Sequence, residues 1–187
     1  YDLSDASIRV GLAEYVGRVK PTARYPASVA PGLASATGDV LLVGFEGLTD
    51  FDAPLAADHL AAAGVPFAAR GVTVRFPKSF RSDAKVTRFA RALDRDEAVS
   101  GGTVRSALAD AVADELDEET RVGFPAMLGD DDDEGVRAEL ADRLGVSVFE
   151  VPTGPPSLLG LTLEDLLFDA LDAAGVRISS GNPAVDY

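Results

Sequence analysis

Three segments of this 187-residue sequence end a predicted helix with glycine and enter an apolar stretch at once. The glycines are Gly64, Gly145 and Gly175. Glycine just past a helix adopts the left-handed conformation at little cost, so each one predicts a helix end followed by a strand. A chain of strand–helix–strand units folds into a mostly parallel sheet with right-handed crossovers.

Capping residues and apolar runs predict where the elements lie. Asp52 with Pro54 begins one helix, an acidic run begins another, and Thr162 with Asp165 resembles a capping box for a third. The apolar segment 39–45 is typical of a strand covered on both faces. We predict strands at 39–45, 70–76, 121–126, 146–151 and 176–179. We predict helices at 5–19, 53–63, 83–94, 103–117, 133–144 and 163–174.

The expected fold is a single α/β domain: a mostly parallel sheet of about five strands with helices on both faces. Residues 1–37 are predicted as an N-terminal helix and a Pro- and Ala-rich connector, and residues 38–187 as the α/β domain. The two helices between the second and third strands are expected to form a separate flap. Because the chain opens without an initiator methionine and closes without a terminal element, we expect a stretch of a larger polypeptide.

Charge and cysteine content exclude several classes of function. The formal charge of -14 and the pI near 4.3 make a surface that repels phosphate backbones and anionic lipids, which argues against nucleic-acid and polybasic membrane binding. No cysteine is present, so disulfides, thiolate zinc sites, iron–sulfur clusters and cysteine nucleophiles are excluded. No apolar run approaches the roughly 18 residues that cross a bilayer.

The kind of charge predicts adaptation to high salt. Only three of the 17 basic residues are lysines, and 21 of the 31 acidic residues are aspartates. Short carboxylates bind water and cations tightly. Molar salt screens their repulsion, because the Debye length falls to about 3 Å at 1 M.

Two loops follow predicted strands, where open α/β sheets bind ligands. In the segment 44–52 we favour turn formation and helix capping over ligand contact. The segment 152–160 is stiff, with adjacent prolines that cannot continue a ladder. Such a loop either lets a flat ligand approach closely or serves as a rigid elbow between domains, and the residues alone favour the elbow.

No self-contained catalytic set is visible. A basic cluster suits a small anion, with Arg81 and Arg88 as the anion candidates, although pairing with nearby aspartates is the favoured interpretation. The acidic run 130–134 is better explained as a helix start than as a metal site, so no metal is expected. His59 is the only histidine and has no partner nearby in sequence for a Ser-His-Asp triad.

Three motifs carry a family resemblance. They are the strand–helix junction 40–51, the segment 124–129 and, above all, the segment 151–160 with its pattern Pro-Thr-x-Pro-Pro-Ser-x-x-Gly. A weaker match is the segment 88–94. Together they resemble the B subunit of the anaerobic glycerol-3-phosphate dehydrogenases, a flavoprotein family, over about residues 38–178.

The resemblance implies an α/β domain inserted in a larger flavoprotein whose FAD or FMN site is split around it, with no cofactor bound to this fragment alone. It places the flavin-binding glycine motif before Tyr1 and the last flavin-contacting strand after Tyr187. The residues implied on the cofactor or substrate side are Thr153, Pro155, Pro156, Ser157 and Gly160. A basic residue is expected where Thr162 stands, which is a departure from the pattern.

The activity implied for the whole protein is flavin-dependent oxidation of glycerol 3-phosphate to dihydroxyacetone phosphate, with electrons passed to quinone. The fragment alone is expected to be inactive. Its expected partners are a catalytic flavoprotein subunit and an iron–sulfur subunit, in the cytoplasm and peripheral at the inner face of the membrane. The alternatives are a non-catalytic domain that docks the electron-transfer subunits and, third, a stand-alone ligand-binding protein.

Overall fold

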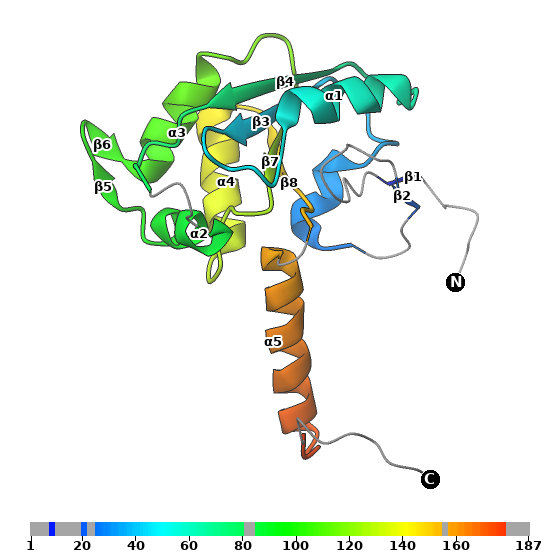
Figure 1. The fold of residues 1–187 in the computed structure, drawn as a ribbon, viewed down its shortest axis with the longest axis vertical. Coiled ribbons are helices and arrows are strands. Elements are labelled where there is room, and N and C mark those ends of the chain that lie inside the picture. The colour runs from blue at the N-terminus through cyan, green and yellow to red at the C-terminus, as the bar shows by residue number, and fades with distance from the viewer. Residues whose placement is uncertain (1–7, 10–19, 22–24, 81–84, 155–156, 179–187) are drawn as a thin grey trace.

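A four-stranded parallel sheet forms the centre of the molecule (Figure 1). The computed structural model describes residues 8–9, 20–21, 25–80, 85–154 and 157–178. The strands lie in the order β4-β3-β7-β8, and every neighbouring pair is parallel. Their bounds are β3 (Val40–Phe45), β4 (Ala69–Val74), β7 (Arg121–Pro125) and β8 (Ser147–Val151).

Helices cover both faces of this sheet. Helix α1 (Ala53–Ala62) packs on one face, against Val40 and Leu42. On the other face, Leu41 and Val43 pack into a larger core. That core is covered by α2 (Val86–Asp94), α3 (Val104–Ala113) and α4 (Asp133–Leu144). The alternation of side chains along a strand explains the two cores, and the predicted α/β fold with helices on both faces is confirmed.

The helix ends predicted at the three glycines are also confirmed, whereas the helix predicted over 103–117 ends at Ala113. Gly64, Gly145 and Gly175 have φ angles of 70°, 69° and 72°, in the left-handed region. Asp52 caps α1, because its Oδ1 accepts a hydrogen bond from the Leu55 amide at 3.0 Å. The acidic run begins α4, with Asp132 as its N-cap.

The last helix differs from its prediction. Helix α5 (Leu158–Ala173) begins five residues before the predicted start at 163. Its cap is Ser157, whose Oγ accepts from the Gly160 amide at 3.1 Å. The proposed capping box at Thr162 is therefore wrong, and the Thr162 hydroxyl instead donates to the Leu158 carbonyl within the helix. Residues 176–178 of the predicted fifth strand form no strand, and residue 179 lies outside the described residues.

The N-terminal part also differs from the prediction. Where the periodicity predicts a helix over 5–19, β1 (Ile8–Arg9) pairs antiparallel with β2 (Lys20–Pro21). The rest of that predicted helix lies outside the described residues. Local periodicity is a weak prior that pairing between segments overrides. The connector contains a 3-10 helix, η2 (Ala27–Gly32), which packs beside β8.

The expected flap does not form a separate unit. Phe89 and Leu93 of α2 lie in the same core as Leu108 of α3 and the sheet residues. A short antiparallel hairpin, β5 (Ala98–Val99) and β6 (Gly102–Thr103), joins the two helices. Apolar side chains on both helices bring them onto the sheet, because burial of that surface outweighs the entropy of fixing them.

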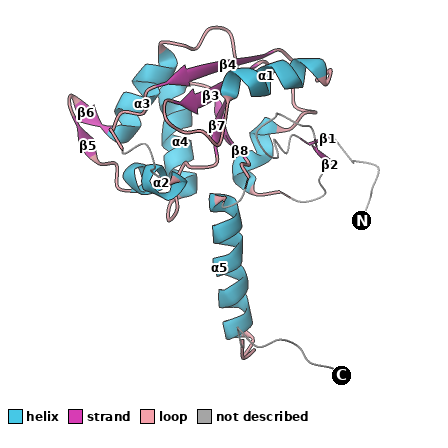
Figure 2. Cartoon of the chain, viewed as in Figure 1, coloured by secondary structure: helices cyan, strands magenta, loops and turns pink. Residues whose placement is uncertain are grey.

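Helix α5 projects away from this body, as Figure 2 shows. Its large side chains are exposed along most of its length, with Leu166 61% accessible and Leu163 and Leu167 also more than half accessible. An apolar surface of this kind marks a contact site. None of the helices in the described part of the chain is both long and apolar enough to span a membrane.

Candidate functional site

The carboxyl ends of β7 and β8 open into a mostly apolar cavity of about 640 Å³. The two strands run parallel, and Pro125 pairs with Val151 at their ends, so the loops that follow both strands lie at one edge of the sheet. Three further segments complete the wall: the connector before η2, the start of α4 and the first turns of α5. This is the edge where open α/β sheets bind ligands.

A buried carboxyl group stands in the wall of this cavity. Glu150 of β8 is 1% exposed, and its Oε1 accepts a hydrogen bond from the Leu128 amide at 2.8 Å. Burial raises the pKa of Glu150, and the charge of Asp133 raises it further, while the hydrogen bond from Leu128 lowers it. The net effect is a pKa above the usual value for glutamate, which is typical of functional sites.

The connector supplies another part of the cavity wall. Ser28 of η2 is 2% exposed and lies close enough to the Glu150 carboxyl to lower its pKa. Within the described residues, however, the Ser28 Oγ completes no hydrogen bond of ordinary geometry. A buried hydroxyl of this kind is unusual in a folded domain. The connector therefore brings an incompletely satisfied polar group to the cavity.

The loop after β7 is fixed in place by a carboxylate from α2. Asp94 accepts hydrogen bonds from the amides of Asp130, Asp131 and Asp132 at 2.9, 3.2 and 3.2 Å. Gly129, which lines the cavity, has a φ of 146°, and a Cβ there would lie 2.8 Å from the backbone of Asp133. Only glycine adopts this conformation without strain. The rim of the cavity is thus a rigid loop.

Only some of the predicted site residues lie at the cavity. Gly160 lines the cavity, and Ser157 caps α5 beside it. Thr153 is half-buried in the loop but is not part of the wall. Pro155, Pro156 and Arg81 lie outside the described residues. Their roles stay predictions.

The anion candidates are not brought to this cavity by the described residues. Arg88 is exposed on α2 and does not line the cavity, and no lysine or arginine among the described residues does. Acidic side chains line it instead: Asp130, Asp133 and Glu150.

Glu150 is the residue that sequence analysis missed. The segment 146–151 is predicted only as an apolar strand. The signal that could have found Glu150 is a single acidic residue inside an otherwise apolar strand, since such a charge is almost never buried unless it is paired or functional. Ser28 gives no such signal, because a serine in a Pro- and Ala-rich connector is unremarkable.

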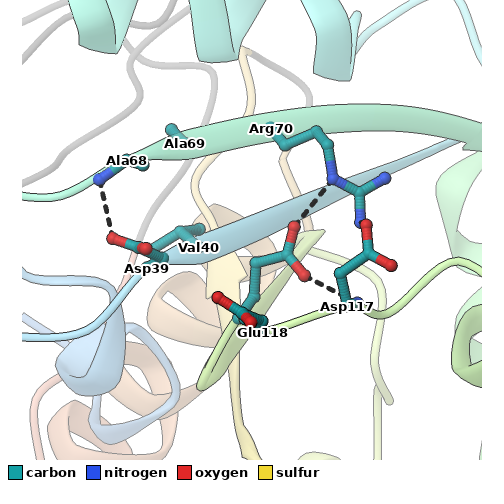
Figure 3. Close-up of a pocket in the computed structure, with 8 residues that line it drawn as sticks. Asp39, Val40, Ala68, Ala69, Arg70, Asp117 and Glu118 are labelled. Atoms are coloured by element: carbon teal, nitrogen blue, oxygen red, sulfur yellow. Dashed lines mark hydrogen bonds and ion pairs between the residues drawn. The ribbon is translucent and has the colours of Figure 1, made fainter.

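A second hollow, of about 500 Å³, lies at the opposite edge, at the amino ends of β3 and β4 (Figure 3). Its charged groups are used in structural contacts. Arg70 Nε donates to Glu119 Oε1 at 2.7 Å, and Glu119 in turn accepts from the Asp117 amide at 2.9 Å. Asp39 accepts from the Ala68 amide at 2.8 Å. These contacts join neighbouring segments and explain the cluster without a ligand.

The cavity at β7 and β8 fits one part of a flavin and not another. An apolar cavity with a few buried polar groups suits a flat, uncharged ring. A diphosphate needs basic side chains or glycine-rich backbone amides at a helix start. The sequence has no Gly-x-Gly-x-x-Gly, and the described wall has no basic residue. The chain therefore suits the ring side of the cofactor and has no site for its phosphates in the described residues.

Comparison with known proteins gives a consistent family. The FAD binding domain family matches residues 9–181. A protein of Halobacterium salinarum described as the probable B subunit of an anaerobic glycerol-3-phosphate dehydrogenase is 64% identical over 174 residues, which cover 91% of this chain and 41% of the relative.

A more distant relative has the same description. The B subunit of the anaerobic glycerol-3-phosphate dehydrogenase of Pectobacterium atrosepticum is 37% identical over 164 residues, which cover 84% of this chain and 37% of the relative. The chain thus spans about two fifths of the length of the curated relatives it matches. No solved structure matches it significantly. The family resemblance seen in the sequence is confirmed.

Proposed function

Because this chain belongs to the FAD binding domain family, we propose that it is the part of an anaerobic glycerol-3-phosphate dehydrogenase B subunit that covers the flavin ring. In this proposal the whole protein oxidises glycerol 3-phosphate to dihydroxyacetone phosphate and passes the electrons to quinone. The observation that carries the proposal is the apolar cavity at the carboxyl ends of β7 and β8, beside the loop that bears the family pattern. The similarity of this chain to the Halobacterium salinarum protein supports glycerol 3-phosphate as the substrate.

The residues of this chain bind and shield in the proposed reaction. When bound, the flavin supplies the hydride-accepting chemistry. The apolar part of the wall, which excludes water from the ring, includes Pro152, Leu159 and Gly160. Ser157 fixes the start of α5 and thereby the position of that wall. The phosphates of the cofactor and the substrate need positive charge from elsewhere, and Arg81 and Arg88 remain our candidates for the substrate.

The full-length polypeptide tests this proposal directly. We expect it to purify with FAD, and glycerol 3-phosphate to bleach the flavin absorbance under anaerobic conditions. Leu159→Arg places a long charged side chain in the cavity and should lower the FAD content at least tenfold. Asp169→Arg introduces the same side chain on the exposed face of α5 and should leave it unchanged. A full-length protein without flavin, or with a flavin that glycerol 3-phosphate does not reduce, would refute the proposed function.

A second candidate function is docking of the electron-transfer subunits without catalysis. The exposed apolar side chains of α5 favour it, since they are accessible on a chain with a formal charge of -14. The partner in this case is the catalytic flavoprotein subunit of the complex, together with its iron–sulfur subunit. Through them the protein would lie in the cytoplasm, at the inner face of the membrane.

Co-purification in molar salt distinguishes the two functions. The docking function requires the tagged flavoprotein subunit to bind the full-length chain. Leu167→Lys, at an exposed position of α5 outside the cavity wall, must abolish that binding. It also requires that no flavin accompanies the chain itself. Flavin on the isolated chain contradicts it.

A further inference from the structure

Glu150 is a buried carboxyl group that no positive charge among the described residues balances. Its carboxyl is buried, and no basic side chain among the described residues contacts it or lines its cavity. The facing groups are the Leu128 amide from the loop after β7, Ser28 from η2 and Asp133 from α4. Asp130 and Tyr25 also line the cavity. Two of these five groups are further acids, so the surroundings oppose a negative charge.

A buried carboxylate without a cation is costly, and proteins usually resolve this by protonation. The hydrogen bond from the Leu128 amide, with smaller favourable contributions from Ser28 and the Met127 amide, offsets only part of the penalty. Burial is the largest influence on the pKa of Glu150 and raises it. The neutral acid is therefore favoured in a wider pH range than for an exposed glutamate.

A purely structural role does not require an acid at this position. Glutamine has the same shape, and its amide oxygen accepts the Leu128 hydrogen bond equally well. Its NH2 group also donates to a hydroxyl such as that of Ser28, without any desolvated charge. An acid where glutamine would suffice points to a role for the proton itself.

The entry of a ligand changes the balance further. An uncharged ring that fills the cavity displaces water from the wall and lowers the local dielectric. The ionised form of Glu150 is then disfavoured more strongly, while the neutral form keeps its hydrogen bond. Ligand binding and proton binding thus become linked.

We propose that this cavity binds an uncharged, ring-shaped ligand and that Glu150 takes up a proton as the ligand enters. The inference rests on the proposed function, because that function places the flavin ring, an uncharged ring, in this cavity. It goes further in assigning Glu150 as the residue that links binding to pH. Glu150 acts here as a positioning residue, which holds the Leu128 loop and sets the charge of the wall.

The test uses the full-length polypeptide freed of its cofactor, with riboflavin as an uncharged probe. Dissociation constants are measured by fluorescence quenching from pH 5 to pH 8, and proton uptake is measured by calorimetry in buffers of different ionisation enthalpy. For the unmodified protein we expect the dissociation constant to rise with pH, by up to about tenfold per pH unit, which is the limit for one linked proton. Glu150→Gln should bind with no such dependence and no proton uptake. Asp142→Asn, which changes an exposed acid of α4 outside the cavity wall, should keep both.

A pH dependence of riboflavin binding that is unchanged in Glu150→Gln would overturn the inference. So would riboflavin binding without proton uptake. If Glu150→Gln fails to fold, the infrared carbonyl band of a protonated carboxyl in the unmodified protein decides: it should grow on riboflavin binding, and a constant band refutes the idea. Reduction of bound FAD by glycerol 3-phosphate with no linked proton leaves the proposed function intact. If riboflavin binding takes up a proton but glycerol 3-phosphate does not reduce bound FAD, the inference is supported and the proposed function is refuted.

Discussion

Replacing Arg121 tests how the connector is attached to the sheet. Arg121 lies at the start of β7, is 4% exposed, and donates hydrogen bonds to carbonyl groups of the connector. Its Nη1 donates to Pro31 and Leu33 at 2.9 and 3.3 Å, and its Nε donates to Gly38 at 3.0 Å. The guanidinium also lies over the Phe67 ring, 4.4 Å from the ring centroid.

The expected cost of Arg121→Met follows from those contacts. Three carbonyl groups lose their donor, and an unsatisfied buried polar group costs about 1–3 kcal/mol. The three carbonyl residues are only half-buried, so water replaces part of each bond, and we use the lower limit. Methionine keeps much of the side-chain volume. The free energy of unfolding should therefore fall by about 3 kcal/mol.

Urea unfolding of the 187-residue chain, followed by circular dichroism in molar KCl, measures this loss. Arg75→Met is the matched control, because Arg75 is 82% exposed and pairs with Glu46 at the surface. It should cost less than about 0.5 kcal/mol. If Arg121→Met stays within about 1 kcal/mol of the control, water satisfies the connector carbonyls and the reasoning fails.

Three further predictions concern packing, acid and salt. Gly71→Ala should lower the free energy of unfolding by about 2 kcal/mol or more, because the added Cβ would overlap the Ala53 backbone. The control Thr73→Ala, at an exposed position of the same strand, should change it by less than about 0.5 kcal/mol. Hydrogen bonding to Arg105 lowers the pKa of Glu139 below its usual value, so the stabilisation is present above the usual pKa of glutamate and is lost as the pH falls through the lowered one. Denaturant titrations at pH 6 and pH 3 should therefore show that the free energy of unfolding falls less for Glu139→Gln than for the unmodified chain. An equal fall contradicts a stabilising role of the Glu139–Arg105 pair. The midpoint of thermal unfolding should rise between 0.1 M and about 2 M KCl, as salt screens a formal charge of -14, and a flat profile argues against salt adaptation.

The local elements were predictable because their signals lie within a few residues. Gly145 ends α4 in the left-handed conformation, and Asp52 caps α1, as the residue types indicate. The predicted strand at 121–126 differs from β7 by one residue. The start of α5 was misplaced because Ser157 competes with Thr162 as a cap, and the sequence offers no way to rank the two when both are good N-cap residues.

The site depended on contacts between distant segments. Arg121 contacts Pro31 and Gly38 across separations of 90 and 83 residues, and Glu150 contacts the Leu128 amide across 22. No local pattern encodes such a meeting, because it arises only when the parallel strands lie side by side.

The sequence by itself therefore determined the α/β class, the helix ends, the family and the loop that borders the cavity. The tertiary structure alone decided the strand order β4-β3-β7-β8, the placement of the connector as a cavity wall and the burial of Glu150. The physical reason is range: capping and turn preferences act through a few bonds, whereas burial and the pKa of a carboxyl depend on every segment that packs around it.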